Sequence, residues 1–537
     1  MPRTPLLRAL RRLADDHRTA DQLGLPVAEA AYTRRDILKR GAVAGAGIVA
    51  GSAYLADHAR AARGAGSARI AIIGGGIAGL ACALALQDKG VSADVYEASS
   101  RVGGRMHSDW QEFGTNFWDN GQQAELCGEL IDTNHKTILQ LAQRFGLSVV
   151  DLLQAQPNGT EDTYWIFGAD YPYAQASIDF KPVHNTLQGQ VQATSYPTTW
   201  NISTDAGKMF DKMTLYDWIT QYVPGGHSSQ MGALLNAAYN EEYGAETTDQ
   251  SALNLIYLLG YKAGPGTWSI YGASDERYHI VGGNSNLPVA IYDALPSSNV
   301  HFGYRMNAIA TNSDGTISVT FDNRQTITAD HVVLCMSFPV LRTLNYKKAG
   351  FDPRKVAAIT QLGAGRNVKL NVQFTSRPWY AFGNDGSMYS DLDFQSSWEV
   401  TRAQAGATGI LVEYPGANVS GSMGQSSPYT TTANNPNVAT YAKQFLAQIE
   451  PIIPGITNQW NGKAMLSTPV TDPNFLCSYS YWKPGQYVAF SGYEGMRQGN
   501  IHFAGEHCSI NFQGFMEGGA QEGQRAASEI LGDLKKA

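Results

Sequence analysis

The feature that most constrains this chain is a glycine-rich turn placed directly after a short run of β-branched residues. Residues Ile70 to Ile73 have the pattern of a buried parallel strand, and Gly74-Gly75-Gly76-Ile77-Ala78-Gly79 follows at once. A helical apolar pattern then runs from Leu80 to Lys89, and Val91 to Tyr96 has the pattern of a second strand. Together these segments predict a β-α-β unit of about 30 residues.

In that context each glycine of the turn has a separate role. Gly74 allows the tight turn, Gly76 lets the backbone approach a pyrophosphate, and Gly79 lets the helix pack closely on the strand. The start of the helix offers free N–H groups and a positive dipole to phosphates. Glu97 ends the second strand, where an acid accepts hydrogen bonds from a ribose diol and disfavours a 2′-phosphate. The sequence therefore predicts a dinucleotide site.

The composition excludes several other classes of protein. A length of 537 residues allows three or four domains at ~150 residues each. The net charge of −7 argues against a basic surface that binds nucleic acid. Apolar residues make up 43% and charged residues only 16%, which excludes a disordered or coiled-coil chain. Five scattered cysteines without a CxxC pair indicate neither a disulfide framework nor a structural zinc site.

The rest of the chain gives weaker structural signals. Apolar residues recur at helical spacing from Gly121 to Leu147, which predicts a helix there. A second nucleotide-domain pattern begins at His279, and residues 317–335 alternate as strands do. The region 151–270 is rich in aromatic residues and polar loops, and residues 415–436 are predicted to form a surface loop.

Three further segments resemble the flavin-containing amine oxidase family. They are Ser100-Arg101-Val102-Gly103-Gly104-Arg105, Phe503-Ala504-Gly505-Glu506-His507 and Phe515-Met516-Glu517-Gly518-Gly519. The resemblance covers most of residues 68–537, and the relatives are monoamine, polyamine and L-amino acid oxidases. It implies an α/β fold in which a glutathione-reductase-like, Rossmann-type FAD-binding domain is interleaved with an α+β substrate domain.

The resemblance also implies domain boundaries and FAD contacts. The FAD-binding domain is expected over 68–130, 275–345 and 460–537, and the substrate domain over 131–274 and 346–459. The last helix would start beside the flavin, with the Met516 backbone at its O2 atom, Glu506 at the ribityl chain and the Met306 backbone at the adenine. The full set of expected FAD-binding residues is Gly74, Gly76, Ile77, Ala78, Gly79, Glu97, Ala98, Arg101, Gly103, Gly104, Arg105, Met306, Trp482, Gly505, Glu506, Phe515 and Met516.

Four side chains are the candidates for the chemistry. Lys369 lies in the alternating segment 367–374; the family places a Lys over the flavin, whereas a strand Lys ordinarily faces solvent. Tyr479 and Phe515 would form two aromatic walls that hold an amine before the flavin. Glu125 could anchor a substrate ammonium, with an ordinary surface or capping acid as the alternative. Venom-type L-amino acid oxidases place an Arg near this point, and this chain has Gln122-Gln123-Ala124 instead.

Cys477 lies where monoamine oxidases carry the cysteine that is linked to the flavin. It has the same spacing to Gly485, but Ser478 replaces the Tyr that follows the cysteine in those enzymes. A buried, inert cysteine is the alternative. We therefore expect non-covalent FAD, with Cys477 as the attachment point if the flavin is covalent.

No metal site is expected. His502, His507 and Cys508 lie close together in sequence, but their strand-turn spacing is predicted to place them beside the ribityl arm of the flavin. No fourth ligand lies near them in sequence.

The first 65 residues resemble a twin-arginine export signal. Thr33-Arg34-Arg35-Asp36-Ile37-Leu38-Lys39 precedes an apolar, Gly/Ala-rich run from Gly41 to about Leu55. This run is too short for a comfortable membrane span, which needs ~20 apolar residues. We expect a bacterial protein that the twin-arginine translocase exports to the periplasm or the medium; an amphipathic surface helix is the alternative.

The resemblance implies an oxidase that acts on a small-molecule amine and molecular oxygen, and no nucleic-acid partner is expected. The amine would be oxidised at its C–N bond to an imine, which water hydrolyses, and oxygen would be reduced to hydrogen peroxide. The alternatives are an L-amino acid oxidase of the same family, a flavin desaturase or dehydrogenase with another electron acceptor, and a non-enzymatic FAD-fold binding protein. The oligomeric state stays open, with a homodimer among the options.

Overall fold

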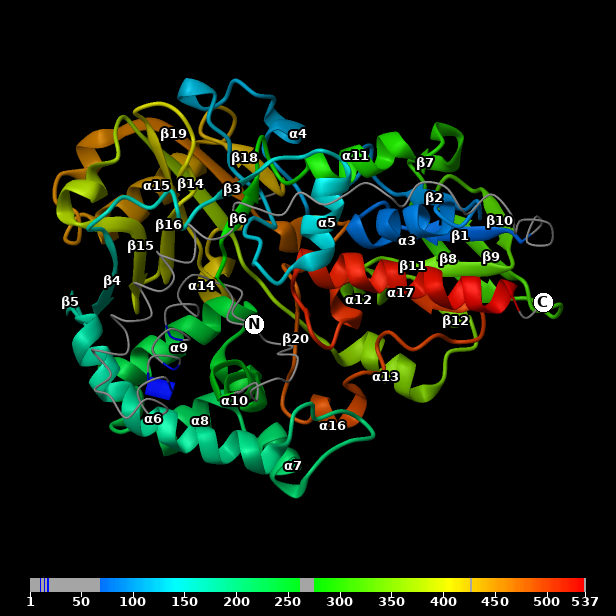
Figure 1. Cartoon of the computed structure of the whole chain (residues 1–537), viewed down its shortest axis with the longest axis horizontal. Coiled ribbons are helices and arrows are strands. Elements are labelled where there is room, and N and C mark those ends of the chain that lie inside the picture. Colours follow the sequence, from blue (N-terminus) through cyan, green and yellow to red (C-terminus); the bar gives the residue numbers. More distant parts are fainter. Residues whose placement is uncertain are drawn as a thin grey trace, which may run out of the picture.

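The glycine-rich turn lies at the carboxyl edge of a five-stranded parallel sheet (Figure 1). The computed structural model describes residues 68–260, 275–424 and 427–535, together with Leu10, Ala14, His17 and Arg18. The predicted export motif therefore lies outside the described residues. In spatial order, the strands of the sheet are β21 (Ile501–Phe503), β11 (His331–Leu334), β1 (Ile70–Ile73), β2 (Asp94–Glu97) and β7 (Val300–Phe302).

Helices cover one face of this sheet, and α3 (Ile77–Gln87) and α17 (Met516–Leu534) pack closely together on it (Figure 1). The close contact between these two helices requires glycine at position 523, because a Cβ there would lie 2.1 Å from the carbonyl oxygen of Ala78. Ile70 and Ile72 of β1 point into the core beneath these helices. Two further helices complete this layer: α5 (Lys136–Arg144) and α11 (Asn286–Ala294).

A four-stranded sheet covers the other face, where Ala71 and Ile73 of β1 share a core with Ile309 and Val319. The alternating exposure of residues 317–321 agrees with the strand pattern predicted for this region. In spatial order the strands are β10 (Thr326–Ala329), β9 (Ile317–Phe321), β8 (Met306–Thr311) and β12 (Asn345–Lys348).

A larger mixed sheet forms the second half of the molecule. It includes residues 460–467, which pair with β14 (Lys369–Phe374) and β18 (Tyr429–Thr431). The expected start of the last FAD-domain segment at residue 460 is therefore too early. In spatial order the strands are β18 (Tyr429–Thr431), β19 (Trp460–Ser467), β14 (Lys369–Phe374), β17 (Gly409–Glu413), β16 (Ser396–Glu399), β15 (Asn384–Ser390), β4 (Glu161–Ile166) and β5 (Ala169–Asp170).

The region 151–270, described from its sequence only as aromatic and polar, contains a cluster of helices around a separate apolar core. Three of its polar residues cap helices: Thr204, Thr214 and Ser229 each accept an N–H of the first turn through the side-chain oxygen. The helices are α6 (Tyr173–Thr194), α7 (Asp205–Lys212), α8 (Leu215–Tyr222), α9 (Gln230–Tyr243) and α10 (Leu253–Gly260).

The helix predicted over 121–147 is confirmed only in its second half, as α5. Residues 122–135 run as irregular chain, because their backbone groups bond to other segments: the N–H of Leu126 donates to His107 and that of Gly128 to Arg105. The loop predicted over 415–436 is also partly wrong, since it contains α14 (Ala417–Gly421) and the buried strand β18.

None of the helices among the described residues is long and apolar enough to cross a membrane.

Short elements connect these layers. Two small ladders pair β13 (Gly363–Ala364) with β20 (Ser480–Tyr481) and β3 (Val149–Asp151) with β6 (Tyr278–Ile280). The remaining α-helices are α4 (Trp110–Phe113), α12 (Phe338–Leu341), α13 (Pro353–Gln361), α15 (Pro436–Ile449) and α16 (Gln486–Phe490).

Candidate active site

A cavity of about 540 Å³ runs from the carboxyl edge of the parallel sheet to the large mixed sheet. Its wall contains nearly all the residues predicted to bind FAD and three of the four predicted for the chemistry. They are Gly74, Gly76, Ile77, Ala78, Glu97, Ala98, Arg101, Gly103, Gly104, Arg105, Met306, Gly505, Glu506, Phe515, Met516, Lys369 and Tyr479.

The start of α3 faces this cavity with its backbone N–H groups free of side-chain caps. Its N-cap residue is Gly76, and no acidic residue stands in its first turn. Gly74 has φ +114°, a conformation that favours glycine. Gly103 and Gly104 run beside Gly76, and a Cβ on Gly104 would lie 3.2 Å from the Gly76 Cα atom. A bare helix start between two glycine segments is suited to an anionic phosphate.

The start of α17 faces the cavity from another side. Glu517 stands in its first turn, but its carboxylate turns away and accepts the N–H groups of Thr137 and Ile138 at the start of α5 (both 2.9 Å). Phe515, the N-cap residue of α17, makes no side-chain cap. The first N–H groups of α17 and its positive dipole are therefore directed at the cavity.

Glu506 holds the cavity wall together. It accepts hydrogen bonds from the Ser480 hydroxyl (2.8 Å) and the Gly514 N–H (2.8 Å). Arg105 Nη1 contacts its other oxygen at 3.2 Å and donates to the Ser478 carbonyl at 2.7 Å. Burial is the largest single influence on the pKa of Arg105 and lowers it, but the charge and hydrogen bond of Glu506, together with Cys477 and Cys127, outweigh burial, so the net shift is upward.

Lys369 begins β14 and is buried, not solvent-exposed as is usual for a strand Lys. Its Nζ atom is 2.6 Å from Glu129 Oε2 and donates to the Cys127 carbonyl oxygen at 2.9 Å. The other Glu129 oxygen accepts the indole N–H of Trp398 at 3.1 Å. The cationic end is thus held at the cavity wall by a short ion pair that is itself oriented by an aromatic side chain.

Aromatic side chains form the wall beside this pair. The Tyr414 and Tyr479 hydroxyl groups are 3.3 Å apart, and the Tyr414 and Trp398 rings have centroids 5.3 Å apart. Phe515 packs edge-on against His135, with a centroid distance of 5.1 Å. Burial lowers the pKa of His135 to about 4, so at neutral pH this ring is an uncharged support for Phe515.

Glu125 does not line the cavity. It is 1% exposed and accepts hydrogen bonds from the Ser108 hydroxyl (2.9 Å), His279 Nε2 (2.9 Å) and the Asn284 N–H (2.7 Å). Burial lowers the pKa of His279, but the hydrogen bond and charge of Glu125, together with the charge of Glu129, more than compensate, and the net shift is upward. This acid joins three segments below the wall, whereas Glu129, four residues later, reaches the cavity.

Three other predicted residues also lie behind the wall. A Cβ on Gly79 would lie 2.0 Å from the Gly74 carbonyl oxygen, so this glycine serves helix–strand packing. Trp482 packs against Tyr487 and Phe490 in the core. Cys477 is 1% exposed, and burial raises the pKa of its thiol to about 11. Its neighbours Ser478 and Tyr479 line the cavity, but Cys477 does not.

The predicted position of His502, His507 and Cys508 beside the cofactor is wrong, because none of these described residues lines the cavity. The His507 ring packs on Phe338, with a centroid distance of 4.4 Å. His502 lies in β21, and its ring contacts His331 at the far edge of the sheet.

Comparison with known proteins agrees with this geometry. Residues 77–531 match the flavin containing amine oxidoreductase family, which is most of the chain. The chain belongs to this family. It is an oxidoreductase that uses a flavin to oxidise amines or amino acids. The family and the type of reaction predicted from the sequence are thus confirmed.

Individual relatives of the family are distant in sequence. An L-amino-acid oxidase of Sistrurus catenatus edwardsii is 21% identical over an alignment of 486 residues that covers 86% of each chain. The structure of a cyclohexylamine oxidase from Brevibacterium oxydans IH-35A matches with a TM-score of 0.74 and 21% identity over 87% of this chain and 99% of that one. A putrescine oxidase bound to putrescine gives 0.70 and 17% over the same shares. These structures show the same fold.

The cavity fits the flavin that the family implies. The uncapped starts of α3 and α17, with the glycines of the turn before α3 and Gly103-Gly104, can receive a diphosphate and a flavin carbonyl. Glu97 and Met306 line the part of the cavity expected to hold a nucleoside. Glu97 already accepts the Gly75 N–H at 2.6 Å and the Ser99 N–H at 2.8 Å, which fixes its carboxylate in the wall.

Sequence reasoning missed Glu129, Trp398 and Tyr414 in the wall. Glu129 lies in the stretch 122–135, where the helix prediction is wrong, so its local sequence carries no reliable signal that it reaches the cavity. Trp398 lies in β16 and Tyr414 directly follows β17, and nothing in their local sequence separates them from core aromatics.

Proposed function

We propose that this chain is an FAD-dependent amine oxidase that releases hydrogen peroxide. An amine with hydrogen on the carbon next to nitrogen, oxygen and water would give a carbonyl compound, ammonia or a smaller amine, and hydrogen peroxide. Bound FAD supplies the hydride acceptor and returns the two electrons to oxygen. The chain's own residues hold the amine, exclude other orientations and keep charge balanced around the reacting carbon.

The observation that carries this proposal is the charge at the end of the cavity near Lys369. Glu129, Asp132 and Glu276 line the wall and are each less than 9% exposed. Among the described residues, Lys369 is the cation at this end of the cavity, and it is ion-paired with Glu129. Buried carboxyl groups in a wall that also carries the aromatic rings of Tyr414 and Tyr479 suit an ammonium group, or an amine that enters as one.

An L-amino acid oxidase is the second candidate, because the curated relatives include enzymes of that name at 21–22% identity. A substrate carboxylate needs a cation to receive it. Among the described residues of the wall, the remaining cations are Arg101, Arg105 and Arg305. Arg105 is paired with Glu506, Arg101 bonds to His107, and Arg305 bonds to Asn474, so the described wall favours an amine without a carboxylate.

The test uses substrate pairs that differ only in a carboxylate. Peroxide release is measured with phenethylamine against L-phenylalanine and with cadaverine against L-lysine. The proposal requires a higher kcat/KM for the amine in at least one pair. Faster turnover of both amino acids would establish the second candidate, and turnover only with an added dye as electron acceptor would make the enzyme a dehydrogenase.

We further propose export of the folded protein through the twin-arginine route, on the basis of the Arg34-Arg35 pair and the apolar run that follows it. The test compares the wild-type chain with an Arg34→Lys, Arg35→Lys double variant in a bacterium that has the translocase. Flavoprotein should leave the cytoplasm only with the arginine pair. Equal distribution of the two proteins would contradict this proposal without bearing on the enzymatic one.

A further inference from the structure

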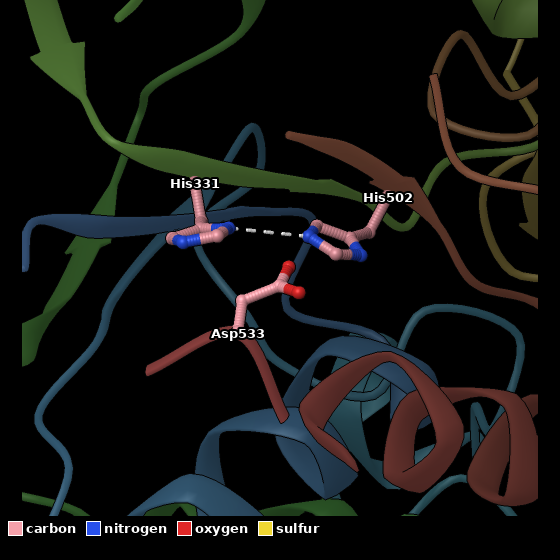
Figure 2. Close-up of side chains that lie close together, drawn as sticks. All are labelled: His331, His502 and Asp533. Atoms are coloured by element: carbon pink, nitrogen blue, oxygen red, sulfur yellow. Dashed lines mark hydrogen bonds between the residues drawn. The ribbon is translucent and has the colours of Figure 1, made fainter. Parts of the chain in front are cut away.

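Two histidines and an aspartate gather at the amino edge of the parallel sheet, opposite the edge that carries the cavity (Figure 2). His331 begins β11, and His502 is the middle residue of β21 and the register partner of Val333. Both rings therefore stand on the same face of the sheet. Asp533 comes from the last turn of α17 and points at the pair in Figure 2.

The spacing of the two rings matches metal coordination. His331 Nδ1 and His502 Nε2 are 3.3 Å apart. Two nitrogens bound to one tetrahedral zinc at ~2.05 Å are separated by about 3.3 Å. A carboxylate oxygen of Asp533 would be the third ligand atom. The three ligand atoms all lie within 4.8 Å of one another, so a small side-chain movement brings the oxygen to the same centre.

A second carboxylate fixes the orientation of His502. Its Nδ1 atom is 2.7 Å from Glu529 Oε2, and Arg525 holds the other Glu529 oxygen. With the proton on Nδ1, the Nε2 lone pair points at His331. Metal-binding histidines usually have this carboxylate on the ring nitrogen away from the metal.

The surroundings permit entry of an ion. His331 is 7% and His502 0% exposed, while the Asp533 side chain is 22% exposed and opens the site on one side. Arg497 pairs with Oδ2 of Asp533, and the carboxylate has a second oxygen.

We propose that His331, His502 and Asp533 form a zinc site that fastens the end of α17 to the parallel sheet, with water as the fourth ligand. Two imidazoles and a carboxylate suit Zn²⁺. The site lies outside the cavity, so the bound ion acts on stability and not on the oxidation. This reverses the expectation from the sequence that the chain has no metal site.

The test is zinc titration of the untagged, flavin-loaded protein after dialysis against a chelator, by calorimetry and elemental analysis. We expect one more Zn²⁺ per chain in the wild type than in His331→Gln or His502→Ala, and a zinc-dependent rise in Tm that both variants lose. Glu529→Gln should weaken binding by about 10–100-fold.

His301→Ala is the matched control, because His301 is also a sheet histidine beside an aspartate, with Asp94 Oδ1 at 3.1 Å, but belongs to no such cluster among the described residues. It should bind zinc as the wild type does. Equal zinc stoichiometry in the wild type and His331→Gln, a variant at the more open ring, overturns the proposal and leaves the two histidines as a hydrogen-bonded pair.

Discussion

Lys369 and Glu129 meet at 2.6 Å in a buried part of the cavity wall, where neither charge is well solvated. Removing one member of a buried pair leaves the other uncompensated, which costs more than the pair itself contributes. Substitutions at the two positions therefore have to be compared with conservative partners, so that loss of charge is separated from loss of folding.

Lys369→Met should retain the flavin but slow its reoxidation by oxygen, because a cation at the wall no longer balances negative charge that develops during electron transfer. We expect a loss of at least about tenfold, equivalent to ~1.4 kcal/mol in the barrier. Stopped-flow mixing of the reduced enzyme with oxygen gives the rate. Lys369→Arg keeps the charge and should lose much less; equal rates in wild type and Lys369→Met would remove Lys369 from this step.

Glu129→Gln and Glu125→Gln separate a substrate contact from a structural acid. Glu129 lines the cavity, so its loss should raise KM for the preferred amine by roughly tenfold, or ~1.4 kcal/mol of binding. Glu125 accepts three hydrogen bonds outside the cavity, so its substitution should lower Tm and leave KM near the wild-type value. Steady-state kinetics and thermal unfolding decide; a larger KM effect at Glu125 would contradict the assignment.

The His279–Glu125 contact gives stability that depends on pH. The folded-state pKa of His279 is raised, so its contribution is complete below the ordinary histidine value of ~6.5 and is lost as pH rises through the folded value. Against His279→Gln, wild type should gain about 1.5–3 kcal/mol at pH 5.5. Urea unfolding at pH 5.5 and 8.5 measures the difference, and a gap that widens at pH 8.5 would reverse the sign.

At the scale of elements, the turn before α3 needs glycine at positions 76 and 79 for two different reasons, which can be tested separately. A Cβ at position 79 would lie 2.0 Å from the Gly74 carbonyl oxygen, whereas the nearest atom to a Cβ at position 76 is 3.8 Å away. Gly79→Ala should therefore destabilise even the flavin-free protein by about 1–3 kcal/mol.

Gly76→Ala should leave the flavin-free protein within about 0.5 kcal/mol of wild type and weaken only flavin binding, since its new methyl group meets the cofactor and not the protein. Urea unfolding without flavin and fluorescence titration with FAD give the two quantities. If Gly76→Ala were as unstable as Gly79→Ala without flavin, the assignment of separate roles would fail.

Local sequence predicts the elements whose residues are constrained by near neighbours. β1 and the start of α3 are predicted correctly because strand, turn and helix follow one another at short range. Residues 122–135 were predicted as helix because Leu126, Leu130 and Ile131 have helical spacing, but their N–H groups find partners on other segments. The same limit applies to the site: the phosphate turn is local, whereas the Glu129–Trp398 contact joins residues 269 apart in sequence.

At the scale of the whole molecule, the cavity lies where segments from distant parts of the sequence come together. The parallel sheet supplies Glu97 and the glycine turn, the last helix supplies Met516, and the large mixed sheet supplies Lys369. A cofactor bound there would contact segments from the beginning, middle and end of the chain. Its binding energy therefore adds to the stability of the assembled molecule, as for any ligand specific to the folded state.

FAD should accordingly be held without a covalent bond, and its release should lower Tm. Cys477, the candidate for a thioether, does not line the cavity, and burial raises the pKa of its thiol to about 11, which disfavours the reactive thiolate. Acid precipitation followed by centrifugation should leave a yellow supernatant, and added FAD should restore the Tm of flavin-free protein. A yellow pellet that becomes colourless in Cys477→Ala would show instead that the loop around Cys477 rearranges to bring its sulfur to the flavin.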